Sequence, residues 1–112
     1  MPSKSFFSSR VLFLFCLFGL FLGKLPAVDT GGLHFPPKDG SANGKKVVLI
    51  SGDEEYRTEE SFPMLAKILS QKQGFDCVVL FAINPEGGYI DPNFQKNIPG
   101  TGELANADLL II

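Results

Sequence analysis

Cysteine and histidine are scarce in this sequence. Cys16 and Cys77 are the only two cysteines among 112 residues, and His34 is the only histidine. Cys16 lies in a segment that we interpret below as an export signal, and one remaining cysteine cannot form an internal disulfide. His34 stands beside two prolines in a glycine-rich stretch, where we expect a surface side chain rather than a ligand. We therefore expect no disulfide framework, no metal site and no cofactor.

The chain also lacks a basic cluster and a long apolar run. Lysine and arginine are spread along a sequence whose net charge is −2. Because nucleic-acid-binding domains carry a concentrated positive patch, we expect no nucleic-acid partner. A membrane-spanning helix needs about 20 apolar residues, and no run here is that long. Contact with a membrane is expected only through the N-terminal signal segment.

The first 27 residues are organised like a secretory signal peptide. Lys4 and Arg10 give a basic start, the apolar run Val11–Leu22 follows, and Ala27 supplies a small residue for cleavage. We predict a signal peptide at 1–27 and an exported protein, periplasmic or extracellular. An uncleaved N-terminal anchor is the alternative. Residues 28–44 are rich in glycine and contain two adjacent prolines, which predicts a flexible linker.

Residues 45–112 have the pattern of an α/β domain. Val47–Ile50 and Phe75–Ile83 are apolar segments typical of strands covered on both faces, and a third strand is expected at Asp108–Ile112. The apolar residues between the first two strands have helical spacing. A helix between two strands predicts parallel pairing with a right-handed crossover. The helical stripe consists of Phe62, Leu65, Ala66 and Leu69.

Proline and glycine set the expected limits of this helix. Pro63 fits best in a first turn, which predicts a start near Glu60 or Ser61. Gly74 is a natural stop. Since one helix covers only one face of a sheet, the opposite apolar face is expected to stay exposed.

Five polar side chains follow the first strand at once, in the run Asp53–Arg57. Ligands of open α/β sheets bind in the crevice beyond the carboxyl ends of the strands, so this run is placed where a site would be. A long connection, which begins near residue 84, leaves the second strand on the same side and is expected to border the same crevice.

The residue types in this run suggest roles. Glu54 and Glu55 are candidates for an acid–base pair. Asp53, Tyr56 and Arg57 are candidates for substrate binding, through hydrogen bonds, ring stacking and capture of a hydroxyl pair. The alternative is a solvated loop whose acids favour a helix N-terminus, with Arg57 bonded to Glu60.

Four segments, read together, resemble the start of trehalose-utilisation (ThuA-like) domains, in particular exported members. They are Ser51–Arg57, Phe62–Leu69, Asn97–Gly100 and Ala107–Ile111, and the resemblance covers Lys45–Ile112. It implies a flavodoxin-like parallel sheet, like that of class I glutamine amidotransferases, and a role in carbohydrate metabolism. Because such domains are longer, residues 45–112 are expected to hold only the first β-α-β-loop-β part, with further domains of a longer chain as partners.

Two functions are consistent with this sequence. One is the N-terminal part of an exported ThuA-like domain that acts on trehalose or a keto-sugar. The alternative is a non-catalytic carbohydrate- or partner-binding module of a larger exported protein. A phosphate-accepting receiver domain also carries acids after its first strand, but export would separate it from a cytoplasmic phosphodonor. Whether the chain is an enzyme is left open. Cys77 lies inside a strand, so we expect a core residue rather than a nucleophile.

Overall fold

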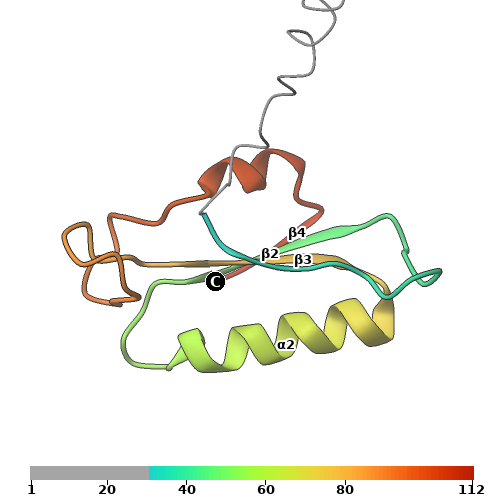
Figure 1. The fold of residues 1–112 in the computed structure, drawn as a ribbon, viewed down its shortest axis with the longest axis horizontal. Helices are drawn as coiled ribbons and strands as arrows, with labels where there is room; N and C mark the ends of the chain where they lie inside the picture. Colours follow the sequence, from blue (N-terminus) through green and yellow to red (C-terminus); the bar gives the residue numbers. More distant parts are fainter. Residues whose placement is uncertain (1–30) are drawn as a thin grey trace, which may run out of the picture.

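The computed structural model describes residues 31–112, so the signal prediction for residues 1–27 lies outside the described part. The fold is a small α/β domain with a four-stranded mixed sheet, in the strand order β1-β3-β2-β4, and one main helix (Figure 1). Along the chain the elements are β1 (Leu33–Phe35), β2 (Lys46–Ser51), α2 (Thr58–Gln73), β3 (Asp76–Phe81), the 3-10 helix η2 (Thr101–Asn106) and β4 (Leu109–Ile111).

Three neighbouring strands of the sheet, β3, β2 and β4, are parallel, and β2 lies between the other two. Val48 of β2 lies opposite Val78 of β3 on one side and Leu110 of β4 on the other. The predicted parallel pairing of the first two strands is therefore confirmed. Because all three strands run in one direction, their carboxyl ends meet at one edge of the sheet.

Strand β1 was not expected. It pairs antiparallel with β3, with His34 opposite Val78, and this corrects the linker prediction for residues 33–35. Gly32 permits the close approach, since a Cβ at this position would lie 2.6 Å from the carbonyl oxygen of Val79. Three residues between glycines and prolines are too few to show a strand period, which is why the pattern missed them.

Helix α2 begins earlier than predicted. It starts at Thr58, so the prediction that Pro63 occupies the first turn is wrong. A hydrogen bond of 2.8 Å between the hydroxyls of Ser51 and Thr58 ties the helix start to the end of β2. Pro63 lies inside the helix and cannot donate the N–H that the carbonyl of Glu59 would otherwise receive. Gly74 ends the helix with φ 75°, as predicted.

Both faces of the two central strands, β2 and β3, are covered. Helix α2 packs under one face, and η2 with the connection before it lies over the opposite face (Figure 1). On this second face Val48, Val78 and Leu80 are fully buried. Leu110 of β4 on this face stays 40% exposed, but over β2 and β3 the expectation of an exposed second face is wrong, because apolar side chains outside any predicted helix cover it. These side chains are Ile98, Leu104 and Ala107.

Cys77 belongs to the core on the α2 side and is fully buried, as predicted. Burial foremost, and then the neighbouring charge of Asp76, raise the pKa of its thiol to about 11. Since the thiolate is the nucleophile, a thiol with this pKa is unreactive at neutral pH. Cys77 is therefore a packing residue.

Candidate functional site

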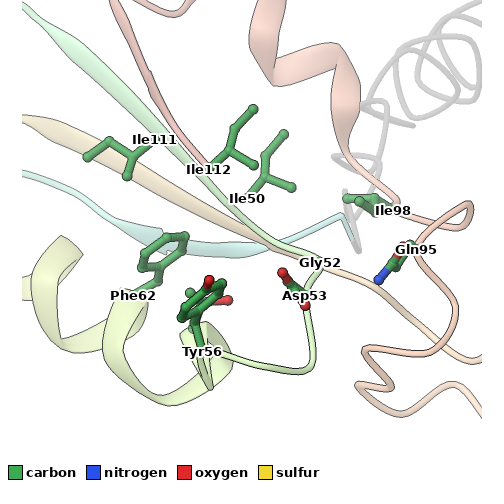
Figure 2. A pocket seen from close by; sticks show the side chains of 10 residues that line it. Ile50, Gly52, Asp53, Tyr56, Phe62, Gln95, Ile98, Ile111 and Ile112 are labelled. Carbon is green, nitrogen blue, oxygen red and sulfur yellow. The ribbon is translucent and has the colours of Figure 1, made fainter.

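A crevice of about 510 Å³ opens at the carboxyl edge of β2 and β4 (Figure 2). This volume lies in the range of small-molecule sites. The wall comes from the ends of two strands, the loop into α2, the start of α2 and the long connection. The lining residues are Ile50, Gly52, Asp53, Tyr56, Thr58, Phe62, Gln95, Ile98, Ile111 and Ile112.

The loop between β2 and α2 forms one wall. It is held at both ends by the hydrogen bond between Ser51 and Thr58. Inside the loop, the Asp53 carboxylate accepts the N–H of Glu55 at 3.1 Å, which shapes the turn. Arg57 closes the loop in the left-handed conformation, with φ 50°. A non-glycine residue is strained there by roughly 1–2 kcal/mol, so the surrounding structure must hold it.

The long connection forms the opposite wall. The Asn97 amide donates to the carbonyl of Ile83 at 2.7 Å, and the backbone N–H of Ile83 donates to the carbonyl of Asn97 at 2.9 Å. These two bonds fix the connection beside the chain that leaves β3. Gln95 and Ile98, on either side of Asn97, thereby reach the crevice. The expectation that the loop and the long connection share one crevice is confirmed.

The structure separates the five predicted site residues into two groups. Asp53 and Tyr56 line the crevice (Figure 2). Glu54, Glu55 and Arg57 are exposed and are not among its lining residues. The guanidinium of Arg57 forms an ion pair with Glu60, which is the structural alternative stated from the sequence.

Several lining residues were missed by sequence reasoning. Gln95 is the one polar side chain that the long connection contributes to the lining, and no pattern around it points to a site. Ile50 and Ile111 were predicted as strand residues but not as lining residues of a site. Their position at the carboxyl ends of their strands was the sequence feature that could have identified them. Phe62 was assigned to the core, which it joins while also lining the crevice.

Glu59 differs from an ordinary first-turn acid. Its Oε2 atom is buried and has no hydrogen-bond partner among the residues that the structure describes. The N-terminal end of α2 offers the favourable field that a carboxylate needs at this position. Glu59 does not line the crevice, so we assign it no part in ligand binding.

A second polar group stabilises the long connection itself. The Asn84 amide donates to the Tyr89 hydroxyl at 3.0 Å and to Asp91 at 3.4 Å. Hydrogen bonds from the side chain and then the backbone of Asn93 lower the pKa of Asp91 below its usual 3.8. These bonds lie within one loop and order it.

Within residues 31–112 no group of three or more histidine, cysteine, aspartate or glutamate side chains is placed to hold a metal ion. No helix in this range is long and apolar enough to cross a membrane. No protein-family model matches the chain, and comparisons with curated proteins and with solved structures give no significant match. The functional argument therefore depends on the crevice and its residues.

Proposed function

We propose that this chain belongs to an exported ThuA-like domain and that its crevice binds a carbohydrate. The observation that carries the proposal is the position of the crevice in the strand order. β2 is the first of the parallel strands along the chain, and it lies between the second, β3, and the third, β4. A flavodoxin-like sheet begins with the same strand order. Ligands of such sheets bind where the strand order changes direction, and the crevice lies at the ends of β2 and β4.

The exposed lining residues support a polyhydroxylated ligand. Tyr56 is 72% exposed and offers a ring face for stacking. The Asp53 carboxylate accepts hydrogen bonds from hydroxyl groups, and the Gln95 amide both donates and accepts. A few such groups around an apolar site are what orients a small ligand.

The non-catalytic module is supported by one observation of its own. Glu54 and Glu55, the proposed acid–base pair, do not line the crevice. A general acid or base must reach the proton it transfers, directly or through one water. A binding module needs only Asp53, Tyr56 and Gln95, which do line it.

Calorimetry on the full chain tests the binding proposal. The titrants are trehalose, methyl β-glucoside and 3-keto-glucose. Asp53→Asn and Tyr56→Ala should each weaken binding at least tenfold, which corresponds to about 1.4 kcal/mol. Their stability should change by only about 0.5 kcal/mol, because both side chains are exposed. Lys72→Ala, in the last turn of α2, is the surface control. Unchanged affinity in both crevice variants would place the site elsewhere.

A double variant, Glu54→Gln with Glu55→Gln, separates the enzyme from the module. If the pair is catalytic, the variant binds sugar like the parent but loses turnover of trehalose or the keto-sugar. If the parent binds sugar without turning it over, the chain acts as a binding module.

A further inference from the structure

The crevice changes in polarity from its inner wall to its rim. Four of its apolar residues are buried or half-buried, whereas Asp53, Tyr56 and Gln95 are exposed. Figure 2 shows Ile50, Ile111 and Ile112 on the strand side, across from Asp53 and Tyr56. The polar groups therefore gather at the outer rim. The inner apolar residues are Ile50, Phe62, Ile98 and Ile111.

Few polar side chains lie at the inner wall. Thr58 is the only inner lining residue with a polar side chain among those described, and its hydroxyl already bonds to Ser51 at 2.8 Å. A ligand hydroxyl pressed against the isoleucines would lose its water without gaining a partner. A free sugar or trehalose carries hydroxyl groups on every side, so it matches the rim but not the inner wall.

We infer that the ligand is a glycoside with an apolar aglycone, an alkyl or aryl group of about six carbons. This inference rests on the proposed carbohydrate-binding function and specifies its substrate class. The sugar ring occupies the rim at Asp53, Tyr56 and Gln95. The aglycone covers the inner wall at Ile50 and Ile98 and extends to Ile112, the exposed end of the same strand side. A crevice of about 510 Å³ is large enough for a drug-sized ligand, so ring and aglycone fit together.

The test compares ligands that share a sugar and differ in the aglycone. Calorimetry on the full chain uses methyl β-glucoside, hexyl β-glucoside, trehalose and 1-hexanol, all below micellar concentrations. Each methylene that becomes buried adds about fourfold in affinity. Hexyl β-glucoside should therefore bind at least tenfold more tightly than methyl β-glucoside, and 1-hexanol, which lacks the sugar, should bind more weakly than hexyl β-glucoside.

Two matched variants locate the aglycone. Ile112→Ser alters a crevice residue that is 83% exposed, so folding is little affected. Ile68→Ser alters an isoleucine that is 51% exposed on α2 and is not a lining residue. The ratio of the affinity for hexyl β-glucoside to the affinity for methyl β-glucoside should fall in Ile112→Ser and stay unchanged in Ile68→Ser.

The outcomes are distinguishable. Equal affinity for the two glucosides, or tighter binding of trehalose than of hexyl β-glucoside, overturns the inference and leaves carbohydrate binding intact. If the ratio of these two affinities is the same in Ile112→Ser as in the parent, the inference is overturned as well. If 1-hexanol binds as tightly as hexyl β-glucoside, the sugar contributes nothing and both proposals fail. Absence of binding by all sugars likewise removes both.

Discussion

Asp108 joins two strands through its carboxylate. The carboxylate accepts the backbone N–H of Lys46 at 2.8 Å and a hydrogen bond from the Lys45 ammonium at 3.1 Å. These two donors, the backbone one foremost, lower the pKa of Asp108 below its usual 3.8. A carboxyl group whose folded pKa is depressed stabilises the fold above its unfolded pKa and loses that effect as the pH falls through the folded value.

Asp108→Asn should therefore lower the melting temperature at neutral pH. The difference from the parent should shrink once the pH falls below about 4, where the unfolded aspartate becomes protonated. Thermal melts between pH 7 and pH 2 measure it, with the exposed Asp39→Asn as control. A difference that stays constant across this range would show that the charge of Asp108 does not contribute.

Consecutive residues of the loop after β2 differ in what they contact, and this limits prediction at the residue scale. Sequence order correctly placed Asp53 and Tyr56 beyond a strand end, and both line the crevice. A loop has no regular period, so no spacing rule could separate them from Glu54 and Glu55. The side chain of Arg57 is positioned by the left-handed backbone of this residue and by its ion pair with Glu60.

At the scale of elements, the end of α2 depends on Gly74 for two reasons. Its φ of 75° is unfavourable for other residues, and a Cβ there would lie 1.8 Å from the carbonyl oxygen of Ser41. Two other glycines separate these effects. Gly44 has the same φ of 75° with open space around it, and Gly102 has open space and no positive φ.

Substituting each glycine by alanine should give a graded series. Gly102→Ala should change stability by less than about 0.5 kcal/mol. Gly44→Ala should cost roughly 1 kcal/mol, from backbone strain alone. Gly74→Ala should cost roughly 3 kcal/mol, because the clash with Ser41 adds to the strain. Urea denaturation measures all three, and equal losses at positions 44 and 74 would contradict the role of the close approach.

Most of the elements that could be predicted have enough residues to show a period, whereas the predicted third strand at Asp108–Ile112 is confirmed as β4 although it has only three residues. β2, α2 and β3 have six, sixteen and six residues, and all three were found from apolar runs and helical spacing. β1 has three residues and gains its structure from pairing with β3. η2 has six residues and no fully buried side chain, and its ion pair between Glu103 and Lys46 joins positions far apart in the sequence.

At the scale of the whole molecule, one chain segment serves both fold and site. The connection between β3 and β4 buries the second face of the sheet through Ile98 and Leu104. The same connection supplies Gln95 and Ile98 to the crevice. Because Ile98 contributes to both, the crevice wall is anchored to the core. Sequence reasoning placed this connection on the correct side but could not show that it covers the sheet, since the contacts are long-range.

The most direct test of the proposed site is an amide NMR titration of the full chain with methyl β-glucoside. Binding in the crevice predicts the largest shift changes in Gly52–Thr58 and Gln95–Ile98, the segments that form its two walls. The exposed face of α2, around Met64 and Ile68, should show none. Changes confined to that face, or to the loop at Asn84–Ile90, would contradict the account by placing the sugar outside the crevice.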